Sequence, residues 1–128
     1  MEISKTTKYI FLSHFIIMMV FAVWFFVSPE SWSTLTGWPN EPSAGRILGG
    51  AIMAIGVASL LGYRASTWDE VEIIVIMVLI YNIVGIVGML WNYAYLTLPV
   101  AGWGIIGLYG LYLILYFYVY YDAKLKKA

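Results

Sequence analysis

Four long apolar stretches dominate this chain, and each can cross a lipid bilayer as an α-helix. They occupy residues 9–27, 44–63, 71–91 and 99–121. A hydrocarbon core about 30 Å thick needs roughly 20 helical residues, because each residue advances the helix by about 1.5 Å. With 62% hydrophobic and only 11% charged residues, a chain of this length cannot bury its apolar surface in a water-soluble fold. The sequence therefore predicts an all-α integral membrane protein, a four-transmembrane-helix bundle that forms one domain over residues 1–128.

The positive charges predict how these helices are oriented, because Lys and Arg accumulate on the cytoplasmic side of short loops. Six basic residues lie near the chain ends or between the second and third stretches: Lys5, Lys8, Arg64, Lys124, Lys126 and Lys127. The other two loops contribute only Arg46. We therefore expect both termini to be cytoplasmic and the loops at residues 28–43 and 92–98 to be external.

Missing residue types and patterns exclude several kinds of chemistry. The chain has no cysteine, which excludes disulfide exchange, thiolate catalysis and thiolate metal sites. His14 is the only histidine, and no acidic residue accompanies it at the spacing of a metal site. No nucleophile beside a base and no deep pair of carboxylates is evident. We therefore expect a protein that is not an enzyme, holds no metal or cofactor and binds no nucleic acid.

Small residues predict where helices pack closely, since small side chains let two backbones approach where lipid removes the hydrophobic driving force. On the second helix they follow Arg46 at intervals of four: Gly50, Ala54, Ala58 and Gly62. On the fourth helix, Gly104 and Gly107 lie on one side. We expect both stripes to face neighbouring helices.

Arg46 lies in the first turn of the second helix, where the helix dipole disfavours a cation. It therefore needs a specific anion, and Glu30, Glu41 or a lipid phosphate lies on the same side of the membrane. Ser43 is the expected N-cap of this helix. We favour a guanidinium that reaches the headgroups or a loop carboxylate over one that binds a ligand.

Two polar side chains interrupt the apolar helices. His14 lies in the cytoplasmic half of the first helix, and Asn82 lies near the middle of the third. An unsatisfied amide in lipid costs several kcal/mol, so Asn82 must face protein or water. For both residues we favour a hydrogen bond to a neighbouring helix. The alternative for His14 is proton transfer, for which Glu72 on the same side would be its partner.

A tyrosine stripe follows the fourth helix through Tyr109, Tyr112 and Tyr116. The phenols of Tyr112 and Tyr116 are too deep for ordinary interface anchors, and each needs a hydrogen-bond partner. They line an internal pocket, bond to Asn82 and His14, or form an interface between copies of the chain; the sequence leaves these three alternatives open.

The stretch PSAGRILGGAIMAIG, residues 42–56, resembles a broad group of small prokaryotic four-helix membrane proteins. In that group a proline-containing outer loop leads to an arginine and a second helix rich in small residues. The resemblance implies the four-helix layout and a multi-pass protein of the prokaryotic plasma membrane, and it implies no particular activity.

Three functions fit these observations. We expect a non-enzymatic accessory protein or self-associating bundle, whose partners are membrane lipids, a second copy or another membrane protein. The first alternative is an oligomeric transporter or channel with His14, Asn82 and the tyrosines along its pathway. The second is a protein that binds a lipid or hydrophobic ligand, in which Arg46 holds a headgroup and Tyr112 and Tyr116 contact the apolar part.

Overall fold

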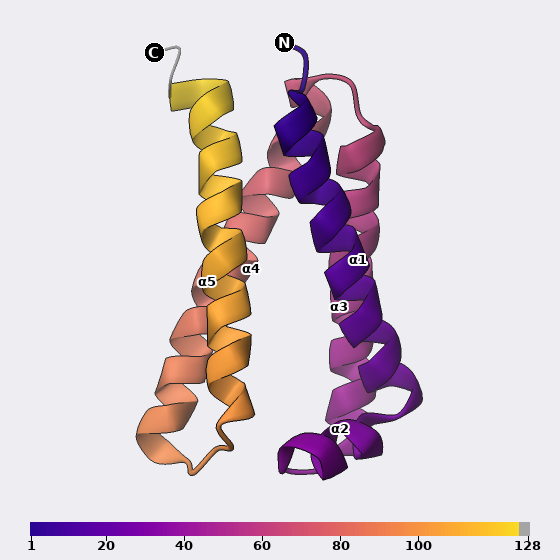
Figure 1. Ribbon diagram of the computed structural model, residues 1–128, viewed down its shortest axis with the longest axis vertical. Helices are drawn as coiled ribbons and strands as arrows, with labels where there is room; N and C mark the ends of the chain where they lie inside the picture. The colour runs from indigo at the N-terminus through magenta and orange to yellow at the C-terminus, as the bar shows by residue number, and fades with distance from the viewer. Residues whose placement is uncertain (126–128) are drawn as a thin grey trace.

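The computed structural model describes residues 1–125 and is entirely helical apart from its loops and one isolated backbone bridge (Figure 1). The helices are α1 (Lys5–Val27), α2 (Pro29–Thr36), α3 (Pro42–Arg64), α4 (Trp68–Tyr95) and α5 (Ala101–Tyr120), followed by a π-helical turn, η1 (Tyr121–Leu125). Four of these elements are long and apolar enough to span a membrane, which confirms the number of predicted spans. Lys126 and Lys127, which the orientation argument used, lie outside the described residues.

The helices α1 and α3 begin a few residues before the apolar stretches, because polar residues cap them. Ser4 caps α1, and its hydroxyl accepts a hydrogen bond from the backbone N–H of Thr7 at 3.1 Å. At α3 the prediction that Ser43 is the N-cap is wrong. Glu41 is the cap and Pro42 is the first helical residue, a position that suits proline. Hydrogen bonds from the Ser43 hydroxyl and backbone N–H hold the pKa of the Glu41 carboxyl below its usual value.

The short helix α2 lies within the stretch expected to be an external loop. Pro29 starts it, and Gly37 ends it in the left-handed conformation with φ of 76°. Its Trp32 packs edge-on against Phe25 of α1, with ring centroids 5.1 Å apart. The connection between α1 and α3 is therefore a helix held against the end of the bundle.

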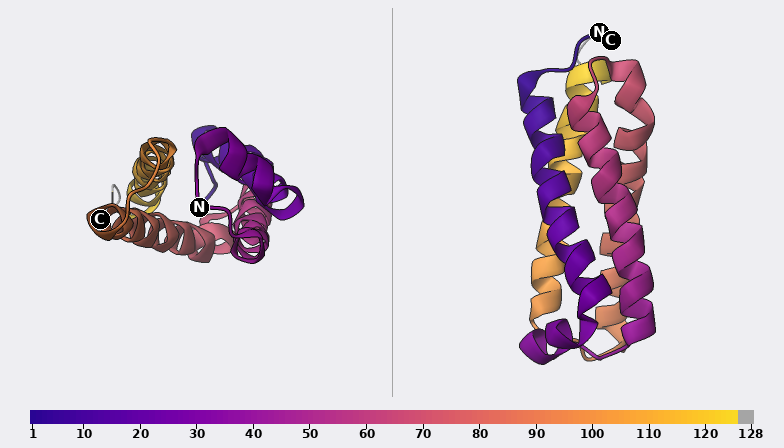
Figure 2. Two further views of the ribbon diagram at one scale, coloured as in Figure 1. Left: turned by 90° about the horizontal axis from the view of Figure 1, so that it is seen from below. Right: turned by 90° about the vertical axis from the view of Figure 1, so that its right-hand side faces the viewer.

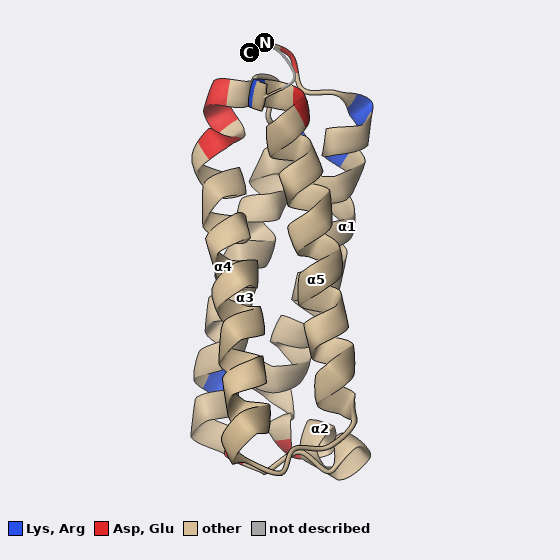
Figure 3. Ribbon diagram, turned by 90° about the vertical axis from the view of Figure 1, so that its left-hand side faces the viewer, with Lys and Arg blue, Asp and Glu red and all other residues tan. Residues whose placement is uncertain are grey.

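The long helices form two antiparallel pairs, one of α1 with α3 and one of α4 with α5 (Figure 1, Figure 2). Both chain ends lie at one end of the molecule and α2 lies at the other. We call these the terminal half and the α2 half. The charged residues lie near the two ends, and most of them are in the terminal half (Figure 3).

The contact between α1 and α3 runs along glycines of α3. A Cβ atom on Gly49 would lie 2.8 Å from the Ala22 carbonyl oxygen and 2.9 Å from the Phe26 backbone nitrogen. A Cβ on Gly62 would lie 2.6 Å from the ring of Phe11, so Gly62 is in the contact as predicted. At Gly50, by contrast, no described atom lies within 4 Å of such a Cβ.

The predicted four-residue stripe is therefore wrong for Gly50 and for Ala54, which is exposed. A four-residue step turns an α-helix about 40° beyond a full turn, so a strict stripe drifts off the contact face. A seam between paired helices alternates steps of four and three instead. The buried positions of α3 are spaced by three, four, three and three residues, and so stay on one face: Gly49, Ile52, Gly56, Ser59 and Gly62. Ala58, the remaining stripe residue, is half-buried.

The glycine side of α5 likewise does not face another part of the described chain. No described atom lies within 4 Å of a Cβ built on Gly104 or Gly107. The tyrosine side of the helix is the buried one, since Tyr112 and Tyr116 are 2% and 0% exposed. No other described helix packs on Gly104 or Gly107, so the close packing expected of this side stays a prediction.

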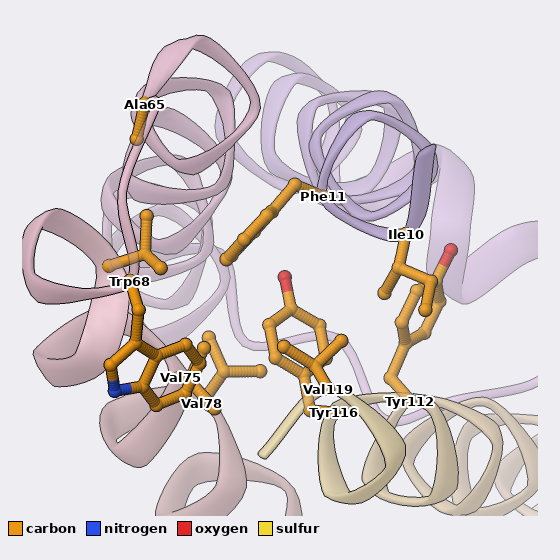
Figure 4. Close-up of a cluster of buried hydrophobic side chains, with 10 residues drawn as sticks. Ile10, Phe11, Ala65, Trp68, Val75, Val78, Tyr112, Tyr116 and Val119 are labelled. Atoms are coloured by element: carbon orange, nitrogen blue, oxygen red, sulfur yellow. The ribbon is translucent and has the colours of Figure 1, made fainter. Parts of the chain in front are cut away.

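The two helix pairs share a buried core in the terminal half (Figure 4). Its members come from both pairs: Ile10, Phe11, Ala65, Trp68, Val71, Val75, Val78, Tyr112, Tyr116 and Val119. A second cluster in the α2 half has buried members from α1 and α3 only: Met18, Ala22, Phe25 and Ile52. The pairs are therefore joined by a core in one half and diverge in the other.

Candidate functional site

A polar cluster lies within the shared core, centred on His14. The imidazole Nδ1 is 2.8 Å from the Ser59 hydroxyl oxygen and 2.9 Å from the Tyr116 hydroxyl oxygen. All three residues are completely buried. Figure 4 shows Tyr116 extending from α5 toward α1. The cluster therefore links α1, α3 and α5, which confirms the hydrogen bond from His14 to a neighbouring helix.

The hydroxyl of Ser59 allows one consistent assignment of the hydrogen-bond donors in this cluster. Ser59 donates its only hydrogen to the Ile55 carbonyl oxygen at 3.1 Å. The Ser59 oxygen can then accept from the Tyr116 hydroxyl, 3.3 Å away, and from the His14 Nδ1–H. The Tyr116 hydroxyl oxygen, 2.9 Å from Nδ1, shares this N–H as a second acceptor. In this arrangement the His14 Nε2 is an acceptor, and it has no partner among the described residues.

The second deep tyrosine of α5 flanks the cluster. The Tyr112 hydroxyl donates to the Ser13 hydroxyl at 3.1 Å, and the Tyr112 ring centroid lies 4.4 Å from that of His14. The hypothesis that the tyrosines bond to His14 is therefore confirmed for Tyr116. No hydrogen bond joins either tyrosine to Asn82 among the described residues.

The short distance between Ser59 and His14 resembles a nucleophile beside a base, but the surroundings favour a structural role. Both side chains are completely buried, and neither lines the cavity described below. The Ser59 proton is also held by a backbone carbonyl. A nucleophile needs access to a substrate, so this cluster fastens helices together.

Glu72 and Arg46, whose partners the sequence left open, each form an ion pair. Glu72 pairs with Lys124, with Oε1 and Nζ 3.0 Å apart, so the hypothesis that Glu72 partners His14 is wrong. Arg46 lies 3.7 Å from Glu30 of α2, one of its expected anions. Both side chains of that second pair are about half exposed, and such pairs contribute about 0–1 kcal/mol.

A cavity of about 250 Å³ separates the two helix pairs in the α2 half. Its walls are mainly apolar side chains of α1, α3 and α5, among them Met18, Phe21, Ile52, Ile105 and Leu108. At the α2 end Trp32, Trp38 and Glu41 line the cavity. At the other end Tyr81, Asn82 and Tyr109 form what we call the floor.

Asn82 borders this floor but exposes none of its own surface to the cavity. Its side chain is completely buried, and its Nδ2 donates to the Val78 carbonyl oxygen at 2.8 Å. A carbonyl oxygen can only accept, so the amide group facing Val78 is the NH2 and the remaining atom is the carbonyl oxygen Oδ1. That Oδ1 has no hydrogen-bond partner among the described residues. The expected interhelical bond of Asn82 is therefore wrong, since its hydrogen bond to Val78 stays within α4.

Beside Asn82, two tyrosines from different helices form a hydroxyl pair. The hydroxyl oxygens of Tyr81 and Tyr109 are 3.1 Å apart, and their rings meet edge-on with centroids 5.4 Å apart. Because one phenol donates to the other, one hydroxyl hydrogen of the pair is left for another acceptor. The floor thus offers one available hydroxyl donor, whereas the unpartnered Oδ1 of Asn82 has no accessible surface.

The structure divides the sequence-predicted residues among three places. His14, Tyr112 and Tyr116 meet in the polar cluster, Asn82 lies at the cavity floor, and Arg46 lies at the α2 end. Sequence reasoning missed Ser59 and the Tyr81–Tyr109 pair. Among the described residues, no group of three or more acidic or histidine side chains could hold a metal ion.

The chain was compared with family models, curated proteins and solved structures, and none of them matches.

Proposed function

We propose that this chain is a multi-pass membrane protein that binds a hydrophobic molecule between its two helix pairs. The cavity in the α2 half carries this proposal. Ligand sites are typically concave and mostly apolar, with a few polar groups that orient the ligand. A dry apolar cavity of about 150 Å³ already accommodates a benzene-sized molecule, and the present cavity is larger. The ligand-binding alternative of the sequence analysis is therefore the one that the geometry supports best.

The other two functions have less support in the geometry. A pathway along His14 and Asn82 would have to cross the shared core, where Phe11, Val75 and Tyr116 are completely buried. Self-association would use the open glycine side of α5, but a stripe of small residues alone does not identify a partner. Neither idea explains the apolar cavity between the helix pairs.

Orientation in the membrane is part of the proposal, and single-cysteine labelling tests it cleanly because the chain has no cysteine. We expect Thr97→Cys, at the exposed α4–α5 connection, to react with an impermeant maleimide on intact cells. Ser66→Cys, at the exposed α3–α4 connection, should react only after the cells are permeabilised. The reverse pattern would place the termini outside.

Ligand binding is tested by a substitution that fills the α2 end of the cavity. Ala44 lines the cavity, whereas Ala54 is an exposed alanine of the same helix that does not. We expect the purified Ala44→Trp variant to retain about tenfold fewer apolar molecules than the unsubstituted protein, because an indole occupies their space. Ala54→Trp should retain them.

The measurement is quantitative mass spectrometry of the molecules extracted from each protein after exchange into delipidated detergent. Circular dichroism and melting temperature establish that both variants are folded. Equal retention by the two variants, or no retained molecule on the unsubstituted protein, would contradict ligand binding in this cavity.

A further inference from the structure

We propose that the cavity takes up a single-chain hydrophobic cation and seats its quaternary ammonium head at the α2 end, beside Trp32, Trp38 and Glu41. This inference rests on the proposed function and names the class of ligand. Three features of the cavity carry it: the charge of its α2 end, the two indole rings there and the apolar length that leads away from them.

The charge at the α2 end of the cavity is negative. Among the described residues that line the cavity, Glu41 is the only charged one. Hydrogen bonds from Ser43 keep the pKa of its carboxyl below the usual value, so the group is ionised at neutral pH. Among the described residues, Arg46 is the only Lys or Arg in the α2 half (Figure 3), and it pairs with Glu30. A cationic ligand would therefore supply the counterion that Glu41 lacks within the described chain.

Two indole rings line the same end of the cavity and suit a quaternary ammonium. The face of an aromatic ring carries negative charge density, and indole attracts a cation more strongly than the other aromatic side chains do. Edge-on contacts with Trp24 and Phe25, at centroid distances of 5.2 and 5.1 Å, hold the Trp32 ring in place. Trp38 is half-buried and has no ring contact with another described aromatic side chain. Aromatic rings beside a carboxylate match a head group that carries charge but donates no hydrogen bond.

The walls define the rest of the ligand. Along α3 the lining extends from Glu41 to Ile52, which corresponds to about 17 Å at 1.5 Å per residue. The walls over this length are mostly apolar, so they suit an alkyl chain whose charge lies at one end. A neutral amphiphile would leave Glu41 without a counterion, and an anionic one would be repelled by it.

The test compares two photoaffinity probes that differ only in charge. One is a dodecyl diazirine that ends in trimethylammonium, and the other ends in the uncharged tert-butyl group of nearly the same shape. Both are added to the full-length protein in nanodiscs of phosphatidylethanolamine, and labelled residues are mapped by mass spectrometry. Cavity labelling is divided by the labelling of lipid-facing positions in the same sample, which corrects for unequal partitioning into the bilayer. We expect this ratio to be about tenfold higher for the cation.

Glu41→Gln and Glu30→Gln are the matched variants. Each removes one carboxylate from the α2 half, but only Glu41 lines the cavity. A glutamine side chain can still accept the hydrogen bonds of Ser43, so α3 keeps its cap. We expect Glu41→Gln to lower the preference for the cation by at least about threefold, and Glu30→Gln to keep it. Trp38→Leu should lower it by a similar factor, because it removes one aromatic face. Melting temperatures establish that the variants are folded.

Unlabelled competitors distinguish two sources of a quaternary ammonium, a free hydrophobic cation and the choline head of a lipid. The phosphate of a choline lipid would lack a cation at the α2 end, since Arg46 pairs with Glu30. We therefore expect dodecylphosphocholine to displace the cationic probe less than dodecyltrimethylammonium does. Equal displacement would keep the ammonium site and assign it to a choline lipid.

The outcomes separate this inference from the proposed function. If neither probe labels the cavity of the unsubstituted protein, ligand binding itself is wrong. If both probes label it equally, binding stands and the preference for a cation is overturned; this comparison needs no variant to fold. Equal losses in Glu41→Gln and Glu30→Gln would attribute the preference to the general charge of the α2 half and overturn the site. A preference that persists in Glu41→Gln would overturn it too.

Discussion

Gly49→Ala is expected to destabilise the protein by about 1–3 kcal/mol, the usual cost of overpacking a tight contact. The added methyl group would lie 2.8 Å from the carbonyl oxygen of Ala22 and 2.9 Å from the backbone nitrogen of Phe26. These are backbone atoms of α1, which cannot rotate away as a side chain could. The two helices would therefore have to separate near the α2 end of their contact.

The neighbouring Gly50 supplies the control. A methyl group there meets no described atom within 4 Å, and alanine favours a helix over glycine by about 0.5–1 kcal/mol. Gly50→Ala should therefore keep or raise the melting temperature. Both variants would be measured by thermal unfolding in the same lipid or detergent. Equal losses in the two would contradict the position of the α1–α3 contact described above.

His14→Ala is the second substitution with a large expected effect. It removes a completely buried ring and the hydrogen bonds that link α1 to α3 and α5. Truncating large buried side chains to alanine costs about 2–5 kcal/mol, mainly because a cavity remains. The loss should therefore exceed that of most single substitutions in this chain.

Tyr116→Phe separates the contribution of the ring from that of the hydrogen bonds. It deletes one hydroxyl and leaves the bond between His14 and Ser59 in place, so we expect a loss of about 1 kcal/mol. Chemical or thermal unfolding of both variants in the same lipid provides the comparison. If the two variants lose the same stability, the His14 ring is not the centre of the cluster.

Much of the helical layout was predictable, because four long apolar stretches leave few alternatives. The observed helix ends differ from the predicted ones because polar residues next to the apolar stretches are helical too. The helix α1 begins at Lys5 rather than at residue 9, and α4 continues to Tyr95 rather than to residue 91. The helix α2 was missed because it is short and polar. Pro29 and Gly37 in the sequence are start and stop signals that could have indicated it.

The candidate site was predictable only in part. His14, Asn82, Tyr112 and Tyr116 could be identified because polar groups in apolar helices are rare and need partners. Their partners could not, since pairing depends on how the helices rotate against one another. The glycine contact was misassigned for the same reason, as Gly49 and Gly50 differ by about 100° around the helix. The cavity depends on how far the helix pairs diverge, which no local pattern encodes.

The shared core makes the terminal half the hinge between the two helix pairs, since both pairs contribute buried residues there. The cavity lies between the pairs at the end away from this hinge. The displacement of a helix grows with distance from its hinge, so a small rotation at the core moves the helix ends in the α2 half most. Under the proposed function, an occupant of the cavity would act as a wedge against the lateral pressure of the surrounding leaflet. Its affinity would then depend on the mechanical state of the membrane.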